Sequence, residues 1–177
     1  HAPADGSVRV ADVTARWACF ALWGPVAPEI LGPLTADALD FGYMTMRDVA
    51  VGDAPVRALR VTFVGELGWE LYCPTEYGAA LWTALAATGT TPGGYRAIES
   101  LRLEKGYRAW GSDIGPTTTP AEAGLGFAVR RGGGFVGAAG AVPEPGRRLR
   151  CLTLADPRAV ALGGEPVRVG GGDGAVV

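Results

Sequence analysis

The stretch VTFVGELGWELY, residues 61–72, carries the strongest local signal for both fold class and candidate site. Two β-prone runs flank the connection GELG at 65–68, a common hairpin length with a glycine at each end. A symmetrical pairing about this connection predicts that Val64 faces Trp69 and that Phe63 faces Glu70. Because side chains alternate along a strand, Tyr72 is expected on the same face as Glu70.

An aromatic ring beside a carboxylate suits a particular ligand chemistry. A flat heteroaromatic ligand with two adjacent N–H donors on its edge can stack on Phe63 and donate both hydrogen bonds to Glu70. The alternative is that Glu70 is a surface carboxylate next to a core phenylalanine, since ionised carboxylates are common on exposed sheet faces. Glu66 is a second candidate, and its place in the turn predicts that it is exposed.

The segments upstream of this hairpin predict more strands and a short helix. The apolar run WACFALW at 17–23 indicates a strand covered on both faces, and a short helix is expected around 28–34. Two further strands are predicted at 43–51 and 56–64, joined by the turn-rich connection GDAP at 52–55.

Two longer helices are predicted downstream. The first covers about 75–88, with Thr75 as its N-cap, three residues at four-residue intervals on its packed side, and Gly89 at its end. These three are Tyr77, Leu81 and Leu85. The second helix covers about 97–106, with Ile98 and Leu101 on one side and Glu99 placed to meet Arg102.

The composition shifts to glycine and proline beyond residue 129. Such a stretch typically links domains, so we expect a boundary near 131–146, with one domain at 1–131 and a linker plus the start of another at 132–177. Short strands are predicted at 148–154, 165–169 and 174–177, which is too little for a domain and indicates a truncated one. Strands and helices in irregular order make the predicted fold class α+β.

Composition excludes several classes of function. The chain has 177 residues, 48% of them hydrophobic, which is enough for a packed core. Its formal charge of −2 does not indicate binding to nucleic acid, because binding to phosphates needs clustered positive charge. No apolar run is long enough to span a bilayer, and no leader peptide is recognisable. The single histidine, His1, rules out a histidine-based metal site. Three cysteines without metal-ligand spacing are expected to be buried thiols of a cytoplasmic protein.

Three motifs in order resemble the glycine-cleavage T-protein (aminomethyltransferase) superfamily. They are GELGWELY at 65–72, AIESLRLEKGYRAWGSDI at 97–114 and TTPAEAGLGFAV at 118–129. The resemblance is best to the branch fused to flavin-dependent dimethylglycine and sarcosine dehydrogenases. It extends to WGPVAPEILGPLT at 23–35, while RRLRCLTL at 147–154 and GGEPVRV at 163–169 resemble the opening strands of the family's C-terminal β-barrel domain. The resemblance therefore implies a fragment: the C-terminal part of a folate-binding domain followed by the first strands of a barrel.

The resemblance also implies a site for tetrahydrofolate. Glu70 matches the glutamate that holds the pterin edge, with Leu71 and Tyr72 beside it. Phe63 and Phe127 match positions where an aromatic residue lines the pocket, although a tyrosine is usual there, so a hydroxyl is lost while stacking is kept. Ile98 stands where the glycine-cleavage aminomethyltransferases usually carry an arginine, which favours the demethylating branch.

The implied chemistry belongs to a larger enzyme. A flavin (FAD) domain would oxidise an N-methyl amine, and tetrahydrofolate would capture the carbon as 5,10-methylenetetrahydrofolate. The aspartate that the family uses to activate folate is expected upstream, because Asp12, Asp37 and Asp40 match no such segment, so the fragment alone is expected to be inactive. A stand-alone aminomethyltransferase and a non-catalytic folate-binding module of the same fold remain alternatives.

Overall fold

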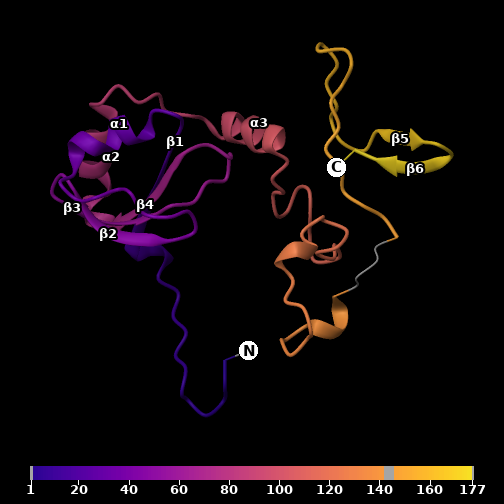
Figure 1. Ribbon diagram of the computed structural model, residues 1–177, viewed down its shortest axis with the longest axis horizontal. Coiled ribbons are helices and arrows are strands. Elements are labelled where there is room, and N and C mark those ends of the chain that lie inside the picture. Colours follow the sequence, from indigo (N-terminus) through magenta and orange to yellow (C-terminus); the bar gives the residue numbers. More distant parts are fainter. Residues whose placement is uncertain (1, 142–145, 177) are drawn as a thin grey trace. The chain divides into compact units, whose positions relative to one another are not determined.

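Four antiparallel strands form the sheet of the first of two units, His1–Lys105, in the order β1-β4-β3-β2 (Figure 1). The computed structural model describes residues 2–141 and 146–176. The strands are β1 (Trp17–Trp23), β2 (Met46–Val51), β3 (Ala54–Leu59) and β4 (Gly68–Pro74). The strands β4 and β3 are the two inner strands of this sheet, and β1 and β2 are its edges.

The strand predicted at 17–23 is confirmed by β1, but it is not covered on both faces. Its exposure alternates along the chain, with Leu22 buried and Cys19 and Ala21 exposed. The β2–β3 connection is shorter than predicted, because Val51 pairs with Ala54 and leaves a two-residue turn. A turn of this length favours positive φ, and Gly52 adopts φ 55°.

The predicted pairing of Phe63 with Glu70 is wrong. The strand β3 ends at Leu59, and Leu59 is the residue opposite Glu70. The predicted pairing of Val64 with Trp69 is wrong for the same reason, although both side chains are buried. The register differs from the prediction by four residues, an even number, so Glu70 keeps its expected face.

The backbone of the 60–67 connection is held by groups outside the predicted ladder. The indole N–H of Trp23 donates to the Val61 carbonyl at 3.1 Å, and Gly24 N–H donates to the Leu67 carbonyl at 2.7 Å. The guanidinium of Arg60 donates to the Gly68 carbonyl at 3.0 Å. These bonds satisfy backbone carbonyls in the connection and at the start of β4. These carbonyls therefore do not need the partners that a symmetrical hairpin would give them.

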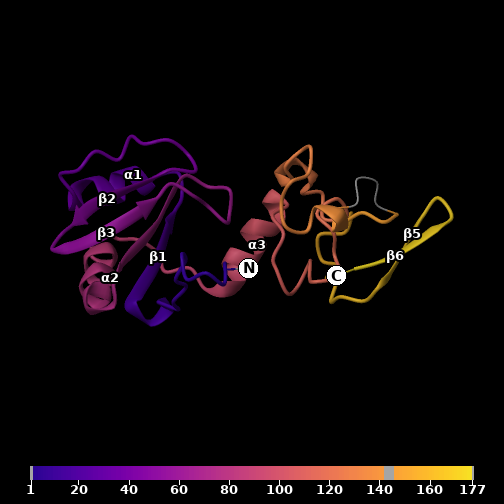
Figure 2. The same cartoon turned by 90° about the horizontal axis from the view of Figure 1, so that it is seen from below.

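One face of the sheet carries the hydrophobic core of the first unit. The helices α1 (Ala27–Leu31) and α2 (Gly78–Ala86) are labelled beside the strands in Figure 2. Both helices contribute buried residues to the same cluster as the strands. Leu31, Leu71 and Leu81 are fully buried in this cluster. The predicted period of Tyr77, Leu81 and Leu85 on α2 is therefore confirmed.

The ends of the helices differ from the predictions in detail. Short 3-10 helices follow α1, at Gly32–Leu34, and precede α2, at Thr75–Tyr77; another, Thr14–Arg16, precedes β1. Thr75 is not the N-cap of α2, because its hydroxyl donates to the Ala15 carbonyl at 2.9 Å. Gly89 adopts φ 82° after the helix, as expected at its end.

The second predicted helix is α3, Tyr95–Lys105. Of the two residues that the sequence places on one side of this helix, Ile98 is half-buried and Leu101 is 41% exposed. Arg102 is 1% exposed and forms an ion pair with Glu99, which confirms the predicted meeting of these two residues. A paired guanidinium with its long aliphatic stem occupies the buried side.

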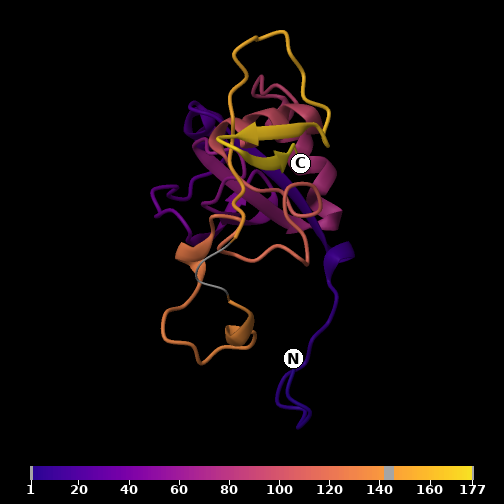
Figure 3. The same cartoon turned by 90° about the vertical axis from the view of Figure 1, so that its right-hand side faces the viewer.

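The second unit, Gly106–Val177, has little regular structure. Its elements are the 3-10 helices Gly126–Ala128 and Ala138–Gly140 and the hairpin of β5 (Pro166–Val169) and β6 (Gly172–Ala175), drawn as two antiparallel arrows in Figure 3. No strand forms at 148–154, which corrects that prediction, and β5 confirms the strand at 165–169. The last predicted strand begins earlier than expected, and its residue 177 lies outside the described residues.

The fold class is confirmed as mixed helix and antiparallel sheet. The domain boundary near residue 132 and the barrel beyond it stay predictions. Of the three cysteines, only Cys73 is buried, while Cys19 and Cys151 are exposed, so the prediction of three buried thiols is wrong. In the part of the chain that the structure describes, no helix is long and apolar enough to cross a membrane, and no cluster of metal-ligating side chains is found.

Candidate functional site

The face of the sheet opposite the core carries polar side chains in rows across the strands. Register places Cys19, Tyr72, Arg57 and Asp48 side by side, one from each strand. The next row holds Ala21, Glu70, Leu59 and Met46. We call this surface, formed by these eight residues, the open face, because its side chains are exposed or half-buried.

Glu70 and Tyr72 are joined on the open face. The hydroxyl of Tyr72 donates to Oε2 of Glu70 at 2.8 Å, and both side chains are half-buried. This hydrogen bond to the carboxylate is the main reason that the pKa of Tyr72 lies well above its ordinary value of 10.0, and burial adds to it. The prediction that the two residues share a face is therefore confirmed.

Neighbouring groups in the row of Tyr72 are also paired or partly desolvated. Arg57 donates two hydrogen bonds to Asp48, at 2.9 and 3.3 Å, and these bonds lower the pKa of the Asp48 carboxyl. Burial raises the pKa of the Cys19 thiol. Sequence reasoning missed Cys19 and Arg57 as neighbours of the site, since only the strand order places β1 and β3 on either side of β4.

The other predicted site residues differ in their burial and in the elements that carry them. The Leu71 side chain is fully buried on the core face, so a ligand bound at the open face can contact only the backbone of Leu71. Phe63 is half-buried in the 60–67 connection, and Phe127 is 87% exposed in the 3-10 helix Gly126–Ala128 of the second unit. Glu66 is exposed, as predicted.

A depression of about 490 Å³ opens at one end of the sheet. Its walls include the ring of Trp17 and two prolines, Pro55 and Pro74, with Arg57 and Asp48 at one side. Glu70 does not line it. The carboxylate therefore needs walls from elsewhere to enclose a ligand.

The three aspartates considered from the sequence are engaged in local contacts. Asp12 accepts hydrogen bonds from the backbone and hydroxyl of Thr14, and Asp37 accepts from the Ala50 backbone at 2.7 Å. Asp40 forms an exposed ion pair with Arg47. None of the three lies in a strand of the sheet. That the folate-activating aspartate lies upstream stays a prediction.

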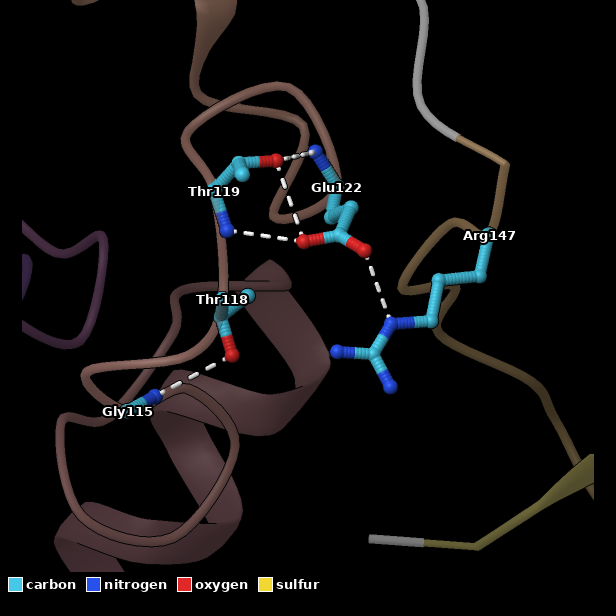
Figure 4. Close-up of polar contacts among 5 residues, drawn as sticks. All are labelled: Gly115, Thr118, Thr119, Glu122 and Arg147. Atoms are coloured by element: carbon cyan, nitrogen blue, oxygen red, sulfur yellow. Dashed lines mark hydrogen bonds and ion pairs between the residues drawn. The ribbon is translucent and has the colours of Figure 1, made fainter. Parts of the chain in front are cut away.

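A second polar cluster lies in the second unit, centred on Glu122 (Figure 4). Its Oε2 accepts from the backbone N–H and the hydroxyl of Thr119, at 2.8 and 3.0 Å, and Glu122 N–H donates back to that hydroxyl at 3.2 Å. Oε1 accepts from Arg147 at 2.8 Å. These bonds, led by the one from the Thr119 backbone, lower the pKa of Glu122 to about 2.

The Glu122 cluster was missed, although the sequence contains a signal for it. Thr119-Pro-Ala-Glu122 fits the capping-box pattern. In this pattern the side chains of a threonine and of a glutamate three residues later each accept a hydrogen bond from the backbone N–H of the other residue. A single helical turn follows and ends at Gly124, which adopts φ 71°. The contact with Arg147, twenty-five residues away, has no local signature.

The model of the GCVT N-terminal domain family matches residues 1–132. The chain belongs to this family. The match covers the sheet, the helices α1 to α3 and the turn around Glu122, which confirms the resemblance found from the motifs.

Similarity to individual proteins points to the same superfamily. Rat mitochondrial dimethylglycine dehydrogenase is 36% identical over 173 residues, covering 90% of this chain and 20% of that protein. Mouse mitochondrial sarcosine dehydrogenase is 42% identical over 118 residues, which cover 63% of this chain and 13% of that protein. The aminomethyltransferase of Rubrobacter xylanophilus is 34% identical over 180 residues, which cover 98% of this chain and 48% of that protein. The chain thus spans from about an eighth to about half of the length of these relatives.

The enzyme names of these relatives support an enzyme family for this chain. They do not test the predicted cytoplasmic location, and two of the names carry the word mitochondrial.

Proposed function

We propose that this chain is the folate-binding part of a dimethylglycine or sarcosine dehydrogenase or oxidase. In that enzyme, tetrahydrofolate would receive the one-carbon unit of an N-methyl amine and leave as 5,10-methylenetetrahydrofolate. The observation that supports this proposal is the Glu70 carboxylate, held by Tyr72 on the open face of a sheet that belongs to the GCVT N-terminal domain family.

The donor and acceptor chemistry of Glu70 fits the edge of a pterin. An ionised carboxylate has about four acceptor sites, and Tyr72 uses one of them. Two adjacent N–H donors can therefore bind without displacing Tyr72, whose hydrogen bond fixes the direction of the carboxylate. Phe63 would add stacking only if the 60–67 connection brings its ring to the ligand.

The chain's own residues would position the folate and not react with it. Bound tetrahydrofolate supplies the nitrogen that takes up the carbon, and holding it beside the carbon source removes much of the entropic cost of their meeting. The activating aspartate and the residues that hold FAD are proposed to come from other parts of the enzyme.

A calorimetric titration of tetrahydrofolate into the full-length protein tests the site. Glu70→Gln should weaken binding by about 1–3 kcal/mol, roughly five-fold to a hundred-fold, because one donor of the ligand meets an amide N–H₂ instead of an acceptor. Glu66→Gln, an exposed glutamate of the adjoining connection, is the matched control and should leave binding unchanged. Equal affinities of both variants and the unaltered protein would remove Glu70 from the site.

A stand-alone aminomethyltransferase is the second candidate, because the match to the Rubrobacter protein covers 98% of this chain. Ile98, at the position where the resemblance leads us to expect an arginine in that group, favours the dehydrogenase branch. An absorption spectrum of the full-length protein separates the two, since only the dehydrogenase branch should show bound flavin. Folate binding without any turnover would instead indicate a non-catalytic module.

A further inference from the structure

Tyr72 has one neighbour from each adjoining strand of the sheet. Register pairs it with Cys19 of β1 and with Arg57 of β3. Arg57 is engaged with β2, because it donates two hydrogen bonds to Asp48. The Tyr72 hydroxyl donates to Glu70, two residues earlier in β4, at 2.8 Å. Cys19 is therefore the cross-strand neighbour best placed to bind the Tyr72 hydroxyl from the other side.

The ladder between β1 and β4 brings the side chains of Cys19 and Tyr72 close together. Just beyond these strands, Gly24 N–H donates to the Leu67 carbonyl at 2.7 Å, so this pair is a hydrogen-bonded one. Bonded and non-bonded pairs alternate in an antiparallel ladder, and Cys19 lies an odd number of steps from Gly24. Cys19 and Tyr72 thus form a non-bonded pair, the kind whose side chains lie closer. Their thiol and hydroxyl groups are hydrogen-bonded to each other.

The supply of protons fixes the direction of these hydrogen bonds. A phenol has one proton, and Tyr72 gives it to Glu70. The oxygen of Tyr72 can then only accept from its other partner, so the S–H of Cys19 is the donor. Burial raises the pKa of Cys19 above its ordinary value of 9.0, which keeps the thiol protonated at neutral pH. The three side chains form one chain, in which Cys19 donates to Tyr72 and Tyr72 donates to Glu70.

We propose that Cys19 is a positioning residue for the Glu70 carboxylate, which it holds in place through Tyr72. This inference rests on the folate-binding function proposed above. With Cys19 in place, the Tyr72 oxygen is bound from two sides, and the acceptor sites of Glu70 that remain for a ligand keep a fixed direction. A site that is ordered before the ligand arrives loses less free energy on binding.

The charges around Cys19 give this chain of hydrogen bonds a measurable signature. On the open face, the charged groups near Cys19 and Tyr72 are Glu70 from β4, Arg57 from β3 and Asp48 from β2. Arg57 and Asp48 have opposite charges and are paired. The hydrogen bond with Tyr72 lowers the pKa of Cys19, whereas the negative charge of Glu70 raises it. Loss of either neighbour should therefore move this pKa, and in opposite directions.

The pKa of Cys19 tests the chain without any ligand. It is read from the Cβ chemical shift in the full-length protein, isotopically labelled at cysteine, with the signal assigned by its loss in Cys19→Ser. Tyr72→Phe should raise this pKa further, and Glu70→Gln should lower it. Glu66→Gln, an exposed glutamate of the 60–67 connection, is the control and should leave it unchanged. A Cys19 pKa that is the same in all of these proteins would overturn the proposal.

Calorimetric titration of tetrahydrofolate into the full-length protein tests the positioning role. Cys19→Val keeps a side chain of similar size without a donor and should weaken binding by about two-fold to ten-fold. Cys19→Ser keeps a donor and should bind as tightly as the unaltered protein. In Tyr72→Phe, the added Cys19→Val should cause no further loss, because the oxygen through which Cys19 acts is gone. Cys151→Val, outside the sheet, is the matched control and should have no effect.

Two results of the titration would refute the role of Cys19. One is a Cys19→Val protein with unaltered affinity, and the other is an equal loss from Cys19→Val with and without Tyr72→Phe. Absence of tetrahydrofolate binding to the unaltered protein would instead refute the proposed function, and the pKa of Cys19 would still decide whether Cys19 holds Tyr72.

Discussion

Tyr72 donates its hydroxyl to Oε2 of Glu70 at 2.8 Å, and the two residues alternate along β4 with the buried Leu71 between them. The strand period alone brings these side chains to one face. The carboxylate is therefore oriented by a neighbour in its own strand before any ligand binds, which is the kind of preparation that a hydrogen-bonding site needs.

The Tyr72–Glu70 pair should make stability fall at alkaline pH. Tyr72 has a raised pKa in the folded chain, so its contribution is fully present below its ordinary value of 10.0 and is lost as pH rises toward the folded value. Phenolate absorbance against pH should show a late phase that disappears in Tyr72→Phe and moves to lower pH in Glu70→Gln. Tyr95→Phe, which removes a tyrosine that is 77% exposed, should retain it. A late phase absent from the unaltered protein would contradict the pairing.

The Glu122 cluster should respond to acid. Its folded pKa of about 2 lies below the ordinary value of 4.5, so its contribution to stability is present above 4.5 and is lost as pH falls toward 2. Carboxyl chemical shifts measured by NMR give this pKa directly. Arg147→Met and Thr119→Val should each raise it toward 4.5, whereas Arg130→Met, an exposed arginine of the same unit, should not. An unchanged value in Arg147→Met would show that the ion pair is not formed in solution.

Leu81 and Leu101 should differ sharply on truncation to alanine. Leu81 is fully buried between α2 and the sheet, so Leu81→Ala should lower the free energy of unfolding by about 2–5 kcal/mol. Leu101 is 41% exposed on α3, so Leu101→Ala should change it by no more than about 0.5 kcal/mol. Urea denaturation of both variants measures the difference. A large loss in Leu101→Ala would place that side chain in the core after all.

Gly68 and Gly24 give a matched test of close backbone approach. Both adopt a positive φ, 149° and 147°, so an alanine at either position costs strain of about 1–3 kcal/mol. At Gly68 the added Cβ would also lie 2.0 Å from the Leu22 carbonyl oxygen, while at Gly24 nothing lies within 4 Å. Gly68→Ala should therefore be much the more destabilising variant in thermal unfolding. Equal losses would mean that β1 and β4 separate more easily than their register indicates.

Local pattern predicted most of the first unit. The strand 17–23, the packed residues of α2, the hairpin of β2 with β3 and the shared face of Glu70 and Tyr72 follow from side-chain periods of two and about four residues, which depend on neighbours in sequence. Three ordered motifs also sufficed to recognise the family that the comparison then confirmed. The buried side of α3 could not be predicted in this way. Arg102 is buried because it is paired with Glu99, and a periodic pattern of apolar residues does not predict a buried charged side chain.

The partners across the sheet were decided only by the tertiary structure. The sequence places glycines where a symmetrical hairpin would turn, yet β3 ends at Leu59, and Trp23 and Gly24 donate hydrogen bonds to backbone carbonyls of the 60–67 connection. The same long-range order brings Cys19 and Arg57 beside Tyr72, and Arg147 to Glu122. Sequence by itself determined which residues of a strand share a face, because alternation is a local property of the backbone. Which residues stand next to one another depended on how distant backbone groups satisfied their hydrogen bonds, and no local pattern records that choice.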